Sequence, residues 1–279
     1  MLALMLGLGA ALSWGLHDIL VRRISEGPNV LGQILVVSLT GAPVLFLLAG
    51  ADLSGLTGRA WLLAAAAGLA YVMAYVGLFR AFGLAPARLV SPVLGAYPML
   101  SLFLAMMTGA TVTLGDWLAV LAVVGGVALV ARMAEEEDRS GGSVRPALMW
   151  AALGAAGFAL TFALGQAASA GDQSLAAGVV TRCTAAAAIL VPLLLVRPSM
   201  GPVRANWRVL LAMGMLDTLA LGLVMLAGSY PHAEYASVAA SLFGVVTILL
   251  AWALMGEKVR ARQWPGIALV FAGIGWLAV

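Results

Sequence analysis

The sequence predicts an all-α integral membrane protein with ten transmembrane helices, arranged as two inverted five-helix repeats. Its composition, its apolar segments and an internal similarity support this. Of 279 residues, 63% are hydrophobic and 10% are charged, and the mean hydropathy is +1.06. A soluble domain is roughly 45–50% apolar and about 25% charged. A soluble fold of this length would therefore lack the polar residues to cover its surface, so we expect a multi-pass protein.

Ten apolar segments have the length of about 17–25 residues that crosses a bilayer. The predicted spans are Leu2–Val21, Asn29–Ala49, Ala60–Arg80, Ala87–Thr108, Thr113–Arg132, Pro146–Ser169, Ser174–Val196, Trp207–Gly228, Ala233–Met255 and Gln263–Val279. Glycine, proline and aspartate, which favour turns, occur at most of the breaks.

The longest polar interruption divides the chain nearly in half. It contains the acidic run Glu135–Asp138, followed by a Ser/Gly run at Ser140–Ser143. Because it has no apolar face to bury, we predict a solvated linker. The predicted division is a first repeat over residues 1–133, an acidic Gly/Ser linker over 134–145, and a second repeat over 146–279.

The two halves resemble each other without a gap at an offset of about 147 positions, where residues 256–279 fall on 109–132. The matched pairs include Gly256 with Gly109, Trp264 with Trp117 and Gly273 with Gly126. Five helices is an odd number, so the second half enters the membrane from the opposite side. Such inverted repeats are common in transporters.

Arg182 and Asp217 are charges near the middle of the seventh and eighth predicted helices. A bare charge at that depth costs about 2.5–3.5 kcal/mol on insertion scales. Antiparallel neighbours would place the two at similar depth, so an ion pair is feasible. Two interpretations stay open. Asp217 could bind an amine or couple protons while Arg182 binds a solute carboxylate, or the pair could only join the two helices.

Further ionisable residues lie nearer the ends of predicted helices. Asp18 is one turn from Arg22, so these two could form an i,i+4 pair. His17 could instead be protonated near neutral pH or bond to a solute. His17 and Asp18 point to different sides of a helix, which argues against a metal site. Glu257 opens the loop after the ninth segment and is expected to be a solvated charge.

Four aromatic side chains are candidates for the wall of a cavity. Tyr71 and Tyr75 share one face of the third predicted helix at i,i+4 spacing. With Tyr97 and Trp14 they could line an amphipathic cavity for a solute that has an apolar part. Packing between helices alone is the alternative.

Several classes of function are disfavoured by what the sequence lacks. There is no phosphate-binding glycine-rich loop with lysine, and no catalytic or metal cluster of known spacing. The single cysteine, Cys183, excludes an internal disulfide. Apart from Arg182, the few Lys and Arg residues lie at helix ends, which sets membrane orientation and does not suggest nucleic-acid binding. We therefore expect no enzyme, no cofactor and no metal.

Three motifs carry a resemblance to a known family. They are Ala11–Gly15 in the first segment, Pro98 after Tyr97, and Gly256–Val259 followed by Gln263, Trp264, Gly266 and Gly273. With these motifs in this order along the sequence, the chain resembles the EamA-type transporters of the drug/metabolite transporter superfamily. The resemblance covers nearly the whole chain, as two EamA domains. The departures are Ala110, where the first repeat could carry an acidic residue, and Val245, where helix nine could carry proline.

The resemblance implies a central cavity lined mainly by helices one, three, four, six, eight and nine, and transport by alternating access. We expect export of a small polar metabolite, an amino acid or a related compound, either facilitated or linked to protons. The predicted substrate-binding residues are Trp14, His17, Asp18, Tyr71, Tyr75, Tyr97, Arg182 and Asp217. A nucleotide derivative, a sugar or a cationic drug are alternative solutes; a non-transporting scaffold or a membrane enzyme is the remote alternative. The expected partners are the solute and membrane lipids, and a monomer would suffice, with a homodimer as the alternative.

The basic residues are distributed unevenly between the two sides. Loops after odd-numbered segments hold Arg22, Arg23, Arg80, Arg88, Arg132, Arg139, Arg145, Arg197, Arg204, Arg208, Lys258, Arg260 and Arg262. Loops after even-numbered segments hold Arg59 alone. We expect the protein in a bacterial inner membrane. The positive-inside rule then places the loops after odd-numbered segments in the cytoplasm and both termini outside. The family resemblance implies the opposite, with both termini inside.

Overall fold

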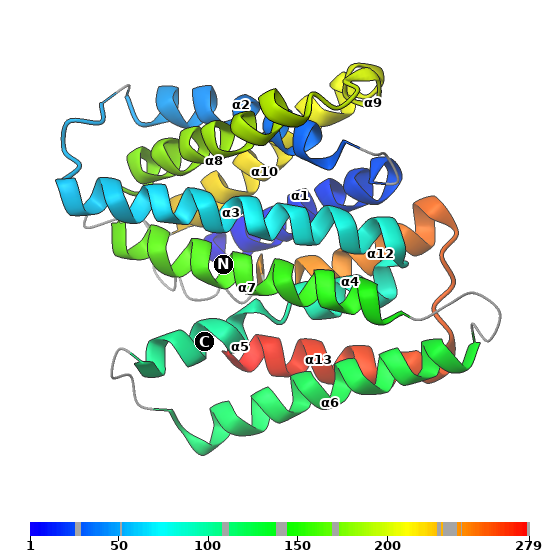
Figure 1. The fold of residues 1–279 in the computed structure, drawn as a ribbon. Helices are drawn as coiled ribbons and strands as arrows, with labels where there is room; N and C mark the ends of the chain where they lie inside the picture. Colours follow the sequence, from blue (N-terminus) through cyan, green and yellow to red (C-terminus); the bar gives the residue numbers. More distant parts are fainter. Residues whose placement is uncertain are drawn as a thin grey trace.

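A computed structural model describes residues 1–25, 29–50, 52–107, 112–137, 144–168, 173–227, 230, 239–240 and 242–277. The elements in these residues are helices, which run side by side through the molecule (Figure 1). They are α1 (Leu2–Ile24), α2 (Val30–Leu48), α3 (Gly58–Leu84), α4 (Ala87–Leu94), α5 (Tyr97–Met107), α6 (Leu114–Glu137), α7 (Arg145–Ala168), α8 (Ser174–Val196), α9 (Gly201–Ala205), α10 (Trp207–Ala227), α12 (Phe243–Met255), the 3-10 helix η1 (Ala261–Gln263) and α13 (Trp264–Leu277).

Six of these helices are long and apolar enough to cross a membrane: α1, α2, α3, α7, α8 and α10. They coincide with the predicted segments one, two, three, six, seven and eight. Shorter apolar stretches lie at Leu114–Val130 and Phe243–Met255. The helical fold and its several membrane-spanning helices are thus confirmed, whereas the number of ten spans stays a prediction.

The fourth predicted segment is divided into α4 and α5. The α4 helix ends at Gly95, whose N–H donates to the carbonyl of Ser91. Pro98 is the second residue of α5, and a proline in the first turn costs no helical hydrogen bond, because N–H groups there have no partner within the helix. The break places Tyr97 at the start of α5.

Local signals explain other helix ends. The side chain of Asn29 accepts from the N–H of Gly32 at 2.8 Å and caps α2. Thr57 caps α3 in the same way. At the end of α12, Gly256 has a φ of +69°, a left-handed conformation that glycine adopts at little cost.

Some expectations fall at or beyond the edge of the described residues. The α6 helix continues to Glu137, so residues 134–137 of the predicted linker are helical. Residues 138–143, Ala110 and residues 233–238 of the ninth predicted segment lie outside the described residues. The division of the chain at the linker stays a prediction.

Glycine lets α3 and α7 pack with their backbones in contact. A Cβ atom on Gly77 would collide with the backbone of Gly154, and one on Gly157 would collide with Ala74. These two helices contact each other more extensively than any other pair in the described part. They join the first half of the chain to the second and form one wall of the site described below.

The α6 and α13 helices lie side by side at the lower edge of Figure 1, next to α5. Gly126, Gly266 and Gly273 lie at their contact, where an added Cβ would meet the facing helix. Gly125 meets no other atom within 4 Å. Small residues on these helices therefore pack within the protomer at three positions, and small residues in such contacts are typical of membrane helices.

Candidate functional site

A cavity of about 360 Å³ lies between α1, α3, α7, α8 and α10. Tyr97 at the start of α5 and Phe243 at the start of α12 also line it. All eight residues that the sequence predicts for the site face this cavity: Trp14, His17, Asp18, Tyr71, Tyr75, Tyr97, Arg182 and Asp217. Their role in binding remains a proposal, but they come from distant parts of the chain and meet in one place.

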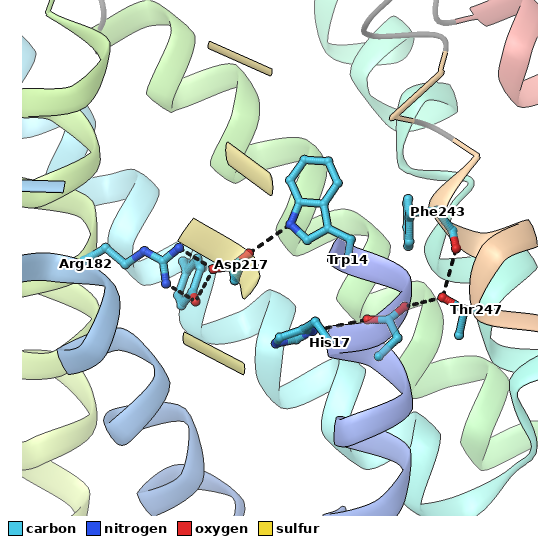
Figure 2. Close-up of polar contacts among 8 residues, drawn as sticks. Trp14, His17, Arg182, Asp217, Phe243 and Thr247 are labelled. Atoms are coloured by element: carbon cyan, nitrogen blue, oxygen red, sulfur yellow. Dashed lines mark hydrogen bonds and ion pairs between the residues drawn. The ribbon is translucent and has the colours of Figure 1, made fainter. Parts of the chain in front are cut away.

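Arg182 and Asp217 form an ion pair at the wall of the cavity (Figure 2). Nη2 of Arg182 donates to Oδ2 of Asp217, and only 4% and 6% of the two residues are exposed. Nη1 of Arg182 donates to the Tyr71 hydroxyl at 2.8 Å, and the guanidinium carbon lies 4.9 Å from the centre of the Tyr71 ring. The ion pair that the sequence allowed is present, and it joins α8 to α10.

Two further groups donate to the Asp217 carboxylate. The indole Nε1 of Trp14 donates to Oδ1 at 3.0 Å, and the hydroxyl of Tyr71 donates to Oδ2 at 3.4 Å. A buried charge is tolerated when it is paired and its remaining lone pairs are satisfied. Asp217 is therefore a neutralised anion, which weakens the interpretation that it captures a cationic drug by itself.

Asp18 has different partners from the one expected. Oδ1 of Asp18 lies 3.3 Å from Nδ1 of His17, and Oδ2 lies 3.1 Å from the hydroxyl of Thr247 on α12. The expected pair with Arg22 is not formed, because α1 turns Asp18 toward α12. Thr247 was not predicted, since spacing along α1 carries no information about the helix that packs against it.

Arg22 contacts Glu257 at one end of the bundle, outside the cavity. Nε of Arg22 donates to Oε1 of Glu257 at 3.0 Å, and the backbone N–H of Ala87 donates to Oε2 at 2.8 Å. Nη1 of Arg22 also donates to the carbonyl of Phe82 at 3.0 Å. The expectation of a solvated Glu257 was wrong: its carboxylate lies at the N-terminus of α4, where helices favour negative charge.

Aromatic rings form much of the cavity wall. Tyr71 and Tyr75 are stacked with centroids 4.2 Å apart, and Tyr75 meets His17 and Phe158 edge-on at 5.7 and 5.9 Å. The ring centroids of Tyr97 and Phe162 are 5.1 Å apart. The tyrosines therefore both pack together and line the cavity, whereas their contact with a solute stays a prediction.

Sequence reasoning missed several lining residues: Phe158, Thr161, Phe162, Thr181 and Phe243. Phe158 and Phe162 have the same i,i+4 spacing as Tyr71 and Tyr75, so this signal was available in the sequence. Phe243 gives no such signal, because it belongs to a uniformly apolar helix.

Comparison with known proteins agrees with this architecture. The model of the EamA-like transporter family matches residues 1–132 and 145–279. No curated protein matches. A solved structure described as "Crystal structure of protein" is similar in fold, with a TM-score of 0.63 and 19% identity. That similarity covers 98% of this chain and 95% of the other.

The family match extends over nearly the whole chain in two repeats, as the motifs in both halves predicted. It agrees with the apolar spans, which make the chain a multi-pass membrane protein. It also agrees with a mainly apolar cavity that has the Arg182–Asp217 ion pair in its wall. The chain belongs to the EamA-like transporter family, in the drug/metabolite transporter superfamily.

Proposed function

We propose that this protein is a secondary carrier that exports an amino acid or a closely related small metabolite by alternating access. The observation that supports it best is the position of the Arg182–Asp217 pair in the wall of an otherwise mainly aromatic and aliphatic cavity. A solute with two opposite charges and an apolar group matches such a wall at both its polar and its apolar parts.

The size and the donors of the cavity support a small zwitterion. Its volume of about 360 Å³ is near the lower end of the roughly 300–1,000 Å³ of small-molecule sites. A guanidinium has five N–H donors, and Tyr71 and Asp217 take only part of those on Arg182. In the proposed complex the others meet a solute carboxylate, which arginine binds with two parallel hydrogen bonds.

The alternative solutes fit this wall less well. A cationic drug has no anionic group to meet Arg182, and Asp217 is already paired. A nucleotide derivative carries several negative charges, and Arg182 is the one arginine or lysine among the described lining residues. A sugar carries hydroxyl groups over most of its surface, whereas most of the cavity wall is apolar.

The first test is transport by the purified protein in liposomes. A panel of labelled amino acids would be supplied with and without a pH gradient, to the wild type, to Asp217→Asn and to Arg59→Gln, a control at an exposed residue that does not line the cavity. We expect saturable transport that Asp217→Asn lowers at least about tenfold, or about 1.4 kcal/mol in barrier, and that Arg59→Gln leaves unchanged. Failure to transport any amino acid would overturn the proposed solute class.

The direction of transport needs a separate measurement. Inside-out vesicles from cells that express the protein should take up the amino acid, whereas right-side-out vesicles should release it when preloaded. A carrier that only concentrates the solute in right-side-out vesicles would contradict export. Dependence on the pH gradient in the liposome assay would distinguish a proton-linked from a facilitated mechanism.

A further inference from the structure

We propose that Nε2 of His17 is the hydrogen-bond acceptor for the ammonium group of the solute, and that Asp18 and Thr247 fix the ring in that role. This inference rests on the proposed function, because it assigns one end of a zwitterionic solute to a place in the cavity. The sequence pointed to Asp217 as the amine-binding group, whereas the geometry points to α1.

The tautomer of His17 follows from its neighbour. Nδ1 of His17 lies 3.3 Å from Oδ1 of Asp18. Oδ1 can only accept, both when Asp18 is ionised and when Asp18 carries a proton on Oδ2. In both of these states Nδ1 holds the hydrogen and donates it, and our proposal takes one of them to be present in place of a proton on Oδ1. In a neutral imidazole this leaves Nε2 with a lone pair, which makes it an acceptor.

Thr247 holds Asp18 in this arrangement. Its single hydroxyl hydrogen lies within reach of two oxygens, the carbonyl of Phe243 at 2.9 Å and Oδ2 of Asp18 at 3.1 Å. If Thr247 donates to Asp18, Oδ2 carries no proton; if it donates to the carbonyl of Phe243, a proton on Oδ2 can bond to the threonine oxygen. Both arrangements leave Oδ1 of Asp18 as the acceptor for His17.

Nε2 of His17 has no hydrogen-bond partner among the residues that the structure describes. His17 is only 2% exposed, and it lines the cavity. In Figure 2 its ring points away from Thr247, toward the side where Asp217 and Arg182 lie. Buried polar atoms in proteins nearly always have a partner, so a buried acceptor without one in a cavity wall indicates a ligand.

The groups around His17 favour a positively charged donor. Asp18 is its neighbour on α1, Tyr75 of α3 meets the ring edge-on at 5.7 Å, and Tyr71 stacks on Tyr75. Across the cavity the charge of Arg182 on α8 is offset by Asp217 on α10. An ammonium group offers N–H donors to Nε2 and meets aromatic faces and carboxylates, whereas an anion would find no donor at Nε2.

The assignment orients the solute and links it to protons. The ammonium group lies at α1, and the carboxylate lies at Arg182 on α8. A proton on Nε2 would occupy the same lone pair as the ammonium group, so protonation of the ring and binding of the solute exclude each other. Such exclusion is what exchange of a proton for a solute requires.

The tautomer can be measured without any solute. The chain has two histidines, so His232→Gln leaves His17 as the only one. Nitrogen-15 NMR of this variant, histidine-labelled in detergent at a pH where the ring is neutral, should show hydrogen on Nδ1 and none on Nε2. In the same background Asp18→Ala should give a mixture of tautomers. Hydrogen on Nε2 with Asp18 intact would overturn the proposal.

The amine assignment is tested with a matched pair of variants and a matched pair of solutes. The amide oxygen of His17→Gln can take the place of Nε2, whereas that of His17→Asn is too close to the backbone. The solutes are L-leucine and 4-methylpentanoate, which lacks the amino group. The wild type and His17→Gln should prefer leucine by at least about tenfold, because a site built for a donor rejects an analogue without it.

His17→Asn should lose this preference while it still binds 4-methylpentanoate. An unchanged preference for leucine in His17→Asn would sink the amine assignment but leave the carrier function standing. If the wild type transports neither leucine nor any other amino acid, the proposed function fails. The NMR result then still decides whether Nε2 of His17 is an open acceptor.

Discussion

Arg182 and Asp217 show how two charges are held inside a membrane protein. Each has its opposite charge as a partner, and Trp14 and Tyr71 satisfy further lone pairs of the carboxylate. Removal of one partner leaves the other charge buried and unpaired. The pair thus joins α8 to α10, and Arg182 lies at the wall of the cavity.

The structural and functional roles of this pair can be separated by a double substitution. Asp217→Asn should lower the free energy of unfolding by about 3–5 kcal/mol, because Arg182 would stay charged and buried. Replacement of both, with Arg182→Met and Asp217→Leu, should recover most of that loss, since a buried pair can be exchanged for apolar groups at little cost. Thermal unfolding in detergent measures both effects.

Transport by the double variant completes this test. We expect the double variant to be folded but inactive, since it has no arginine for the solute carboxylate. An active double variant would show that the pair only joins the helices. A double variant as unstable as Asp217→Asn would contradict the electrostatic reason given for the effect of the single substitution.

Contacts between side chains could be predicted only where both partners are isolated charges in apolar segments. Arg182 and Asp217 stand out because each is an isolated charge in an apolar segment, and their depths agree. Asp18 has a plausible partner one turn away, Arg22, and local spacing therefore suggested the wrong contact. Its true neighbour, Thr247, is 229 residues distant in the chain and is an ordinary polar residue in an apolar run.

At the scale of helices, Glu257 connects several elements at one end of the bundle. Through Arg22 it contacts α1, through the Ala87 N–H it contacts the start of α4, and Arg22 in turn bonds to α3 at Phe82. The glutamate follows Gly256, whose left-handed conformation ends α12 and turns the chain. The Gly-Glu motif therefore has a structural role in the contact it makes with the first half of the chain.

Loss of the Glu257 side chain should loosen this end of the bundle. We expect Glu257→Ala to lower the free energy of unfolding by about 1.5–3 kcal/mol, the range for hydrogen bonds to charged groups. Glu257→Gln should cost less, because an amide oxygen can still accept from the Ala87 N–H. Lys258→Ala, at the exposed neighbouring position, is the control and should be neutral. Equal stability of Glu257→Ala and Lys258→Ala in detergent melts would contradict this role.

Two adjacent glycines in α6 give a matched test of helix packing. A Cβ on Gly126 would meet the carbonyl of Gly266 at 2.7 Å, whereas Gly125 has nothing within 4 Å. Gly126→Ala should cost about 1–3 kcal/mol of stability through overpacking. Gly125→Ala should be neutral or stabilise by up to about 1 kcal/mol, because alanine favours helix over glycine. A loss of equal size at both positions would mean that α6 packs on a second surface as well.

The long helices could be predicted from the sequence because an apolar run of bilayer length is characteristic of a membrane-spanning helix. The division of the fourth segment into α4 and α5 was not predicted. Gly95 and Pro98 are both in the sequence, but glycine and proline also occur inside membrane helices, where neighbouring helices compensate for them. Only the packing of α4 against α7 and α12 settles which of the two outcomes applies.

At the scale of the whole molecule, the cavity lies off-centre along the bundle. It reaches from His17 and Leu78, about two turns from the C-terminal ends of α1 and α3, to Gln166, close to the end of α7, and Ala177, close to the start of α8. The opposite end holds the Arg22–Glu257 contact and most of the basic loop residues. The cavity therefore extends toward the end of the bundle that is poor in Lys and Arg.

Which side of the membrane this end faces depends on the orientation of the chain. The loop charges place it outside, which would make the structure a carrier whose cavity extends toward the exterior. The family resemblance places both termini, and hence this end, inside. The orientation of the chain also determines whether the Arg22–Glu257 contact lies on the cytoplasmic side.

Labelling of two single cysteines decides the orientation. In a Cys183→Ser background, Ser54→Cys lies between α2 and α3, and Ser199→Cys lies between α8 and α9; both positions are outside the long helices. In right-side-out vesicles, a membrane-impermeant maleimide should label the cysteine at position 54 at once. It should label the one at position 199 only after the membrane is permeabilised, since the basic loops are cytoplasmic by the positive-inside rule. The reverse pattern would mean that the family's arrangement overrides the loop charges, and that the cavity extends toward the cytoplasm.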